Sequence, residues 1–577
     1  MLFLLLGLVT GAIGAVPLFL SGKRYLLLGG IYAVIVALAT WGLYYSSPPA
    51  LVNPLWGGVG VFAALAAAVA AGLVVLVNKS DDDRGRASGR SWPAFIVPAI
   101  AFALLAGRGC AGCSALRSSD YAGMIGEVEE RVWTQDVQPN DPHHIRLVPI
   151  ELAAWLADKQ LGEAPGAVGS QFQIDKERMT IQMVKGELWY VAPLDFEGFA
   201  VWNSAGVAPG YIMVSGEDPH RTPVLKMGEK FAYTPAAYFG HNLERHLWTH
   251  GYESLGLADY SFEIDEEGKP WWVVTVYEPT IAWSGESIKG VVIVNPTDGS
   301  SSFHEMGKVP AWVDRAVPKE FVSKYITWRG KFAGGWWNSV WAEKNITAPQ
   351  SPSFIHGNDG EPYWVTDISS SNEKDKSLLG LMYTNARSGK SVFYRAVGSV
   401  DEAVLEAVNN KVAYRRWHGA SPVLYNMYGT MASIVPLLGE SHTFQGVAIV
   451  KIDNASEVAI GDDLAGALRE YQKMLGSHGV SSTPEIAHNR KTVEGKVDRF
   501  AIDVRGQETT YYVHLKDIGV IFTGGSDLTS TLPLTQAGDA VAVTYIESGE
   551  AVVPMMAFEN RSLQLSGTIP PPRPARR

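Results

Sequence analysis

Three histidines lie close together in the stretch HNLERHLWTH, at His241, His246 and His250. On a helix, His246 and His250 share a face at the i, i+4 spacing that zinc sites use. Glu244 does not produce the HExxH order of a metalloprotease. The sequence therefore offers His241, His246 and His250 as a candidate metal site, with ordinary surface and packing histidines as the favoured interpretation.

The chain has two cysteines, Cys110 and Cys113, which form a CxxC motif. Outside the cytosol such a pair tends to be oxidised, so a local disulfide is predicted, with small residues at a helix end as an alternative and redox catalysis as a weaker one. No second CxxC is present to complete a four-thiolate zinc site. No cofactor is expected, because no phosphate-binding or dinucleotide fingerprint occurs in a supporting context.

Three tryptophans, Trp336, Trp337 and Trp341, are concentrated in the loop GGWWNSVW. Such side chains suit a lipid interface or stacking on sugar rings. A packed seam between neighbouring structural units is the favoured interpretation, and a binding surface is the alternative.

A second aromatic pattern recurs along the chain as a turn followed by a strand. The phrases KGELWYVAPL, EGKPWWVVTV and DGEPYWVTDI begin at Lys185, Glu267 and Asp359, and SPVLYNMYG is a degenerate fourth copy. Each of the first three phrases is followed by a further segment. After the second and third phrases, the residue pattern of that segment is typical of a β-hairpin. The pattern predicts tandem units, and Trp272 and Trp364 are expected to occupy equivalent core positions.

These features must be positioned by two very different parts of the chain. Four apolar segments at the N-terminus have the length and composition of membrane-spanning helices. They cover residues 2–20, 25–45, 59–77 and 92–107. The spans contain Thr10, Thr40 and few other polar residues, so an anchor is favoured over a transport pathway.

The basic residues predict the orientation of these helices. The first loop holds Lys23 and Arg24, the third loop holds four more basic residues, and Ser46–Gly57 between them has none. Basic loops stay in the cytoplasm, so the soluble region is expected to be extracytoplasmic, on a multi-pass plasma (inner) membrane protein. If the fourth segment does not span, the soluble region lies on the other side.

Charge argues against nucleic acid as a partner. Residues 1–117 carry eight Lys/Arg and three Asp, so residues 118–577 hold a net charge of −16 within the chain total of −11. The C-terminal region from Arg490 to Asn560 has six Lys/Arg and ten Asp/Glu. Phosphate binding needs the opposite balance.

The soluble part is predicted to be α+β. Amphipathic helical stretches, such as Val400–Val412, precede sets of antiparallel strands about four times. Nearer the C-terminus, a further set of predicted strands has no such helix before it. The expected organisation is a transmembrane region (1–117), four α+β units (118–235, 236–330, 331–399 and 400–480), an OB- or SH3-like β-barrel (490–562) and a disordered tail (563–577).

The helix-plus-strands unit with its DGxPxW-like turn resembles PepSY-type modules, which are small cystatin-like domains. The wider pattern is similar to an uncharacterised family of multi-pass bacterial and phage-encoded membrane proteins with tandem PepSY-like units. The resemblance is carried by Gly169–Ile174, Glu187–Leu194, Pro209–Ser215, Val309–Phe321 and Gly334–Ala342. These motifs carry no known catalytic residues.

The function expected from these features is that of a membrane-anchored, non-enzymatic extracytoplasmic binding or scaffold protein. Its partners would be the lipid bilayer and an envelope protein or polymer, and it could form an oligomer. The alternatives are a subunit of a membrane transport or assembly complex and a metal-dependent envelope enzyme.

Overall fold

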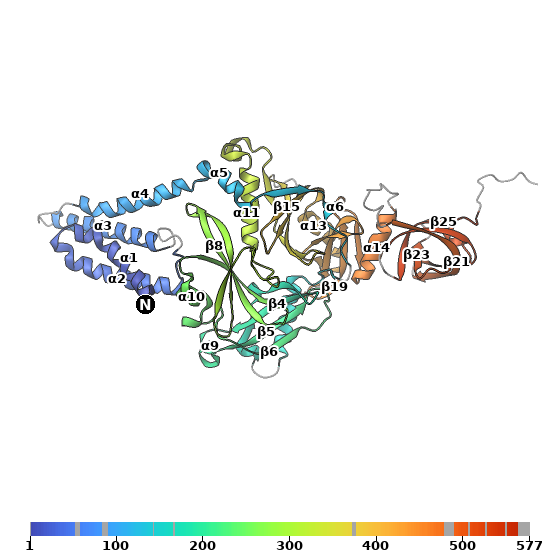
Figure 1. The fold of residues 1–577 in the computed structure, drawn as a ribbon, viewed down its shortest axis with the longest axis horizontal. Helices are drawn as coiled ribbons and strands as arrows, with labels where there is room; N and C mark the ends of the chain where they lie inside the picture. Colours follow the sequence, from blue (N-terminus) through green and yellow to red (C-terminus); the bar gives the residue numbers. More distant parts are fainter. Residues whose placement is uncertain are drawn as a thin grey trace, which may run out of the picture. The chain divides into compact units, whose positions relative to one another are not determined.

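We describe a computed structural model of the chain, in which one N-terminal helical region precedes five β-sheets (Figure 1). The described residues are 2–51, 58–83, 91–141, 144–164, 168–371, 377–477, 490–505, 508–525, 528–547 and 551–563. The predicted tail lies outside them, apart from its first residue.

The chain divides into two compact units, each made of more than one segment. The first contains Met1–Glu130, Ala153–Asp375 and Leu379–Tyr394. The second contains Arg131–Leu152, Lys376–Leu378 and Arg395–Arg577. The finer division stays a prediction.

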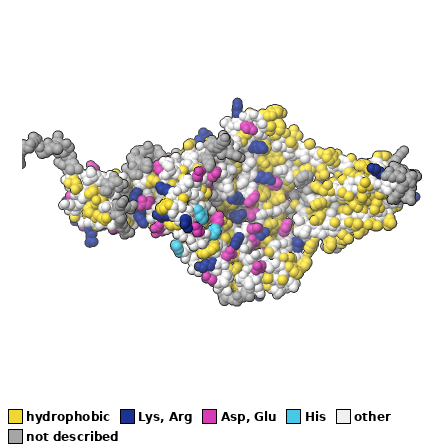
Figure 2. All heavy atoms as spheres, turned by 180° about the vertical axis from the view of Figure 1, so that it is seen from behind, with side chains coloured by type: hydrophobic (Ala, Val, Ile, Leu, Met, Phe, Trp, Pro, Cys, Tyr) yellow, Lys and Arg dark blue, Asp and Glu magenta, His cyan; other side chains and the backbone are white. Residues whose placement is uncertain are grey.

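Four N-terminal helices are long and apolar enough to span a membrane, as predicted. They are α1 (Leu2–Leu20), α2 (Leu26–Ser46), α3 (Val59–Asp83) and α4 (Ile96–Ala111). The last candidate span begins at Trp92, because the short helix η2 (Trp92–Phe95) leads into α4. In Figure 2 hydrophobic side chains cover this region, whereas charged side chains gather on the remainder of that face.

Glycines let α1 pack closely against α2 and α3. A Cβ atom at Gly7 would lie 2.6 Å from the Ala37 carbonyl oxygen, and one at Gly11 would collide with that of Ala33. Small residues spaced four apart permit this backbone approach between membrane helices. The hydroxyls of Thr10 and Tyr44 also lie 2.9 Å apart across α1 and α2.

The two ends of the helical set have different neighbours. At one end, the Arg24 guanidinium and the Tyr25 hydroxyl donate to the Asn78 side-chain oxygen near the end of α3. At the other end, Phe3 and Tyr44 pack with Trp248 of the β-rich region. Lys23, Arg24 and Asn78 therefore lie at the end of the helices away from that contact.

Four sheets follow the helices in the described chain, and β1, which precedes the first of them, belongs to the third. The first has the order β2-β4-β5-β6 with β3 on β4, and the second has β10-β9-β8-β7. The third has β1-β15-β14-β13-β11 with β12 on β13, and the fourth has β16-β18-β19-β20 with β17 on β18. Their strands are β1 (Val128–Arg131), β2 (Phe172–Ile174), β3 (Thr180–Val184), β4 (Glu187–Phe196), β5 (Ala208–Ser215), β6 (Val224–Phe231), β7 (Gly256–Ile264), β8 (Pro270–Ile281), β9 (Ser284–Val294), β10 (Ser301–Glu305), β11 (Thr347–Pro349), β12 (Ser353–His356), β13 (Pro362–Ser370), β14 (Ser377–Asn385), β15 (Ser391–Ser399), β16 (His418–Gly419), β17 (Val423–Met427), β18 (Thr430–Leu438), β19 (Phe444–Lys451) and β20 (Val458–Gly461).

A glycine turn with the same handedness occurs in each of the four sheets that precede the barrel. Gly186, Gly268, Gly360 and Gly429 have φ values of 83°, 83°, 74° and 87°. Each lies in the turn that joins two adjacent strands, namely β3–β4, β7–β8, β12–β13 and β17–β18. Residues with a Cβ atom resist this conformation, so the recurring glycines reflect one turn geometry.

The two tryptophans expected to correspond have matching environments. Trp272 pairs with Phe262 across β7–β8, and Trp364 pairs with Phe354 across β12–β13. Both indoles are buried and donate to a backbone carbonyl, at 2.9 Å for Trp272 and 2.8 Å for Trp364. The prediction that they pack in the core is confirmed.

The region after the membrane helices is mostly β rather than evenly α+β. The longer helices there are α7 (Ile150–Gly162), α11 (Lys319–Phe332), α13 (Asp401–Val412) and α14 (Leu464–Ser477). The shorter ones are α5 (Ser114–Ala122), α6 (Trp133–Asp136), α8 (Val168–Gln171), α9 (Phe199–Ala205), α10 (Leu243–Leu247) and α12 (Gly335–Trp337), with 3-10 or π turns η3 (Gly123–Ile125), η5 (Lys176–Arg178), η6 (Phe239–His241), η7 (Trp248–Tyr252), η8 (Asn338–Ala342), η9 (Ala413–Arg415) and η10 (Leu532–Leu534). A further 3-10 turn, η1 (Lys23–Tyr25), lies between α1 and α2. PepSY or cystatin-like units are not confirmed.

The last five strands close into a small barrel, as predicted. They are β21 (Arg490–Arg505), β22 (Glu508–Leu515), β23 (Ile521–Gly525), β24 (Ala540–Ile546) and β25 (Val552–Asn560), in the order β21-β22-β23-β25-β24. Closure depends on the length of β21, which pairs with β24 through its first part and with β22 through its second. Val513, Phe522 and Val543 are fully buried in the interior.

Candidate functional sites

A membrane-proximal clamp joins the helices to the second sheet. We use this name for α10 and η7, which contact the region where α2 ends. The Trp248 indole stacks on Phe3 with 4.3 Å between ring centroids, and its Nε1 donates to the Pro49 carbonyl at 2.8 Å. The Arg245 guanidinium lies over the Tyr45 ring and donates to the Tyr45 carbonyl at 2.9 Å.

A backbone hydrogen bond extends the clamp beyond its side chains. The Leu51 amide donates to the Glu253 carbonyl at 2.7 Å. Because aromatic stacking, cation–π contact and hydrogen bonds act together, this end of the helices is fixed to the β-rich region.

The candidate metal histidines lie within or beside this clamp. The stretch is not one continuous helix, because Asn242 caps α10 and Gly251 adopts a φ of 103°. His246 and His250 nevertheless bring their rings within 4.1 Å, whereas His241 lies near Tyr233. The spacing thus brings two of the three rings into contact without a helix spanning the whole motif.

Both of those rings are held by backbone carbonyls. A carbonyl only accepts, so His246 Nε2 donates to Gly299 at 2.8 Å and His250 Nδ1 donates to His246 at 2.7 Å. Burial lowers the pKa of His246, which favours the neutral ring. Within the described part of the chain no group of three metal-ligating side chains forms, and the metal site stays a prediction.

Cys110 and Cys113 lie where the chain leaves α4. Both thiols are free and exposed in the structure. The Cys113 amide donates to the Cys110 carbonyl at 3.1 Å, so the two residues share one turn. The disulfide stays a prediction, and the turn brings the two residues near each other at the end of α4.

The tryptophan loop divides into a packed and an exposed part. Trp336 packs beside Tyr121 and Phe332, where α5 and α11 meet. Trp337 and Trp341 are 61% and 73% exposed, and their rings lie 4.4 Å apart. The packed interpretation therefore describes Trp336 and is wrong for the other two.

A buried polar network, which the sequence analysis did not identify, links the first three sheets. His356 Nε2 lies 2.8 Å from Asp314 Oδ2, and both side chains are almost fully buried. The Asp314 carboxylate also accepts from the Met183 amide at 3.2 Å and from Arg387 at 3.3 Å. Asp314 thereby connects the strands or turns that carry these three residues.

Glu263 is the second carboxyl of the network. It accepts from the Asp314 amide at 2.8 Å, from the Ser261 hydroxyl at 3.0 Å and from the Gln182 amide at 3.3 Å. Desolvation by burial, with a contribution from the nearby Asp314 charge, raises the pKa of Glu263 to about 7. The network therefore includes one carboxyl, Glu263, whose charge state depends on pH near neutrality.

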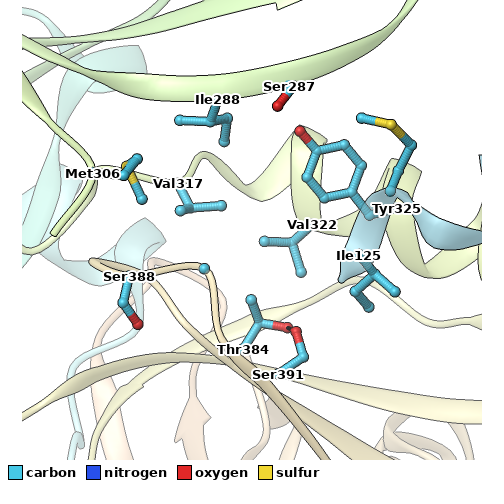
Figure 3. A pocket seen from close by; sticks show the side chains of 12 residues that line it. Ile125, Ser287, Ile288, Met306, Val317, Val322, Tyr325, Thr384, Ser388 and Ser391 are labelled. Carbon is cyan, nitrogen blue, oxygen red and sulfur yellow. Dashed lines mark hydrogen bonds between the residues drawn. The ribbon is translucent and has the colours of Figure 1, made fainter. Parts of the chain in front are cut away.

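A cavity of about 220 Å³ lies between the second sheet, the third sheet and α11 (Figure 3). Its apolar wall comes from Met124, Ile125, Ile288, Met306, Val317 and Val322. Its polar wall comes from Ser287, Tyr325, Thr384, Ser388 and Ser391, with Gly389 beside them. Among the described residues that line it, none is charged.

The hydroxyls of the cavity are partly committed to one another or to the backbone. Thr384 and Ser391 lie 2.9 Å apart, and Tyr325 donates to the Glu286 carbonyl. An apolar surface with a few oriented hydroxyls suits an uncharged group with some polar character. The arrangement can hold such a group by burial and hydrogen bonding.

Comparisons with known proteins do not identify a family. No protein-family profile matches the chain, and no curated protein matches it. Solved structures similar to parts of it include an endo-arabinase from Bacteroides thetaiotaomicron VPI-5482, at 13% identity and a TM-score of 0.16 over 47% of this chain and 73% of that one. A thermostable family-43 glycoside hydrolase has 12% identity and a TM-score of 0.18 over 68% and 96%. At these TM-scores the similarities support no conclusion about fold or function.

Proposed function

We propose that the chain is a membrane-anchored, non-enzymatic binding or scaffold protein whose β-rich region engages an envelope protein or polymer outside the cytoplasm. The cavity between the second and third sheets is the observation that carries this proposal. It is formed by elements far apart in the sequence and combines apolar walls with hydroxyl groups, as binding pockets do.

The size of the cavity indicates what it holds. At about 220 Å³ it is smaller than the pockets that enclose drug-sized ligands, of roughly 300–1,000 Å³. It exceeds an engineered apolar cavity of about 150 Å³ that binds benzene. A side chain or another short apolar group of a larger partner fits these limits.

The distribution of basic residues supports the extracytoplasmic orientation. Lys23 and Arg24 lie at the end of the helices away from the clamp, together with Asn78, which begins the second basic loop. Because basic loops are retained in the cytoplasm, this arrangement supports the proposal that the clamp and the sheets lie outside it, at the plasma membrane.

Finer features of the fold belong to the same proposal. The four equivalent glycine turns support tandem units related by repetition, and the PepSY-like assignment rests on the sequence motifs alone. The barrel order, with β23 parallel to β25, supports an OB-like barrel. Its acidic balance favours a protein contact over nucleic acid.

Site-directed photocrosslinking tests the cavity. A photoreactive amino acid at Ser388, on the exposed rim of the cavity, is expected to give a discrete adduct in native membranes. Ser287→Trp should fill the cavity and abolish that adduct, whereas Thr327→Trp, on the exposed side of α11, should preserve it. An adduct that survives Ser287→Trp, or no adduct at Ser388, would contradict the proposal.

A second candidate function is that of a subunit, either a single copy or an oligomer of this chain, in a membrane transport or assembly complex. It is favoured by α4, in which no residue is buried. Replacing residues 1–111, which include α4, with an unrelated anchor separates the two candidates. Loss of function would favour the complex, and retained function would exclude the helices as the working part.

A further inference from the structure

An exposed apolar tip projects from the β-rich region of the first unit. We define the aromatic tip as Trp337, Val340 and Trp341, whose side chains are 61%, 42% and 73% exposed. The Trp337 and Trp341 rings pack against each other at 4.4 Å, so the tip presents a single apolar surface. Exposed tryptophans grouped with an aliphatic residue indicate a contact surface.

The tip is attached to the place where the chain leaves the membrane helices. Helix α4 ends at Ala111 and α5 begins at Ser114, and α5 packs against both α11 and α12. A Cβ atom at Gly112 would lie 3.1 Å from Ala282, so the β8–β9 hairpin also contacts this exit. In the folded structure, α5 therefore connects the end of the fourth span to the base of the tip.

Other aromatic and apolar groups surround the same exit. Trp283 approaches within 3.6 Å of a Cβ position at Gly109, and Tyr121 packs on Trp328 at 4.9 Å. Leu116, near the start of α5, is 72% exposed. Tryptophan and tyrosine gather in this way at the level of lipid headgroups, where an apolar ring meets water.

Lysines accompany these rings. Lys331 lies 5.5 Å from the Phe332 ring, whereas Lys324, 5.0 Å from the Trp328 ring, pairs with the Glu286 carboxylate at 2.6 Å. Lys344 follows the tip and is exposed. Amphipathic lysines beside exposed aromatics suit a surface that carries anionic headgroups.

We propose that the aromatic tip inserts into the headgroup layer of the same membrane that α1–α4 span, on the side of the β-rich region. The exit of α4 and the tip then form two points of attachment. With the clamp as a third, they fix the orientation of the second sheet and α11 relative to the bilayer. The proposal is independent of what the cavity binds.

Lipid quenching of a fluorophore tests this directly in the full-length protein. In a Cys110→Ser/Cys113→Ser background, Val340→Cys is labelled with bimane and reconstituted into phosphatidylcholine–phosphatidylglycerol vesicles. Lipids brominated near the headgroup should lower its emission about twofold. Trp92→Cys, in the candidate span, is the positive control, and Met227→Cys, an exposed apolar position on β6, is the unquenched control.

Two results would overturn the proposal. One is an unquenched label at position 340 when the label at position 92 is quenched. The other is a change in the position-340 emission in detergent on addition of a muropeptide digest, without quenching by brominated lipid, because that assigns the tip to a glycan polymer. Neither result depends on the cavity, so failure here is distinct from failure of the proposed function.

Discussion

The Trp248 indole stacks on the Phe3 ring, with 4.3 Å between the ring centroids and 15° between the ring planes. Phe3 belongs to the first membrane helix, and Trp248 begins η7 in the β-rich region. The contact joins residues 245 positions apart in the sequence, so it orients the soluble part relative to the anchor rather than stabilising one local element.

Trp248→Ala should loosen this clamp. The substitution removes the stack and the hydrogen bond to Pro49, a loss of about 3 kcal/mol of local stability. Hydrogen exchange of the full-length protein in detergent should rise in Leu243–Tyr252 and in residues 45–51. His250→Ala, at an exposed neighbouring position, should leave exchange of residues 45–51 unchanged. Equal exchange in both variants would show that the stack does not hold the helices.

Gly11→Leu should separate α1 from α2. The new side chain would collide with the backbone of Ala33, and overpacking of this kind costs about 1–3 kcal/mol. The thermal midpoint in detergent should fall. Gly30→Leu is the matched control, because a Cβ atom there has open space around it. A similar fall in both variants would contradict the close packing at Gly11.

Glu263→Gln should change the pH dependence of stability. The folded-state pKa of Glu263 is raised from 4.5 to about 7, so the folded protein holds this proton more tightly than the unfolded chain. Its stabilising contribution is therefore full below about pH 4.5 and is lost as the pH rises through 7. The free energy of unfolding, measured between pH 4.5 and 8, should fall more steeply with rising pH for the wild type than for Glu263→Gln, by up to about 3 kcal/mol.

Asp195 is another carboxyl whose pKa is raised, and it loses its proton over a lower pH range than Glu263. Desolvation by burial raises the pKa of Asp195 from 3.8 to about 6, so its contribution is lost at lower pH. Asp195→Asn should thus leave the slope between pH 6 and 8 largely intact. Parallel curves for the wild type and Glu263→Gln across that window would refute the role assigned to Glu263.

Asp314→Ala should destabilise the joined sheets. It leaves His356 without its carboxylate partner, whereas Arg387 keeps its ion pair with Glu361, and breaking a buried pair costs about 3–5 kcal/mol. A double-mutant cycle with His356→Ala should show coupling, because the two groups are in contact. Glu305→Ala, at an exposed ion pair with Lys308, should leave the unfolding midpoint unchanged. Additive effects of Asp314→Ala and His356→Ala would contradict direct coupling.

The membrane helices could be predicted closely because about twenty apolar residues in a row have few alternatives to a spanning helix. The paired tryptophans were also interpretable, since a glycine turn followed by alternating large residues predicts a buried strand face. Trp272 and Trp364 occupy equivalent core positions for this reason.

The candidate sites were harder to predict because their residues meet only in three dimensions. Glu263, Asp314, His356 and Arg387 come from separate strands and turns, and only their position among apolar neighbours, as in SFEI around Glu263, gave a signal. One continuous helix does not carry the HNLERHLWTH stretch, because Asn242 caps α10 and His250 departs from helical backbone angles. The cavity likewise depends on how two sheets meet.

Cysteine accessibility in intact cells tests the central claim, that the four helices hold the β-rich region outside the cytoplasm. In the Cys110→Ser/Cys113→Ser background, Glu266→Cys lies in the exposed turn before β8, and Lys79→Cys lies next to Asn78 near the end of α3. A membrane-impermeant maleimide should label Glu266→Cys in intact cells and Lys79→Cys only after lysis. Labelling of Lys79→Cys in intact cells, with Glu266→Cys protected until lysis, would contradict the account.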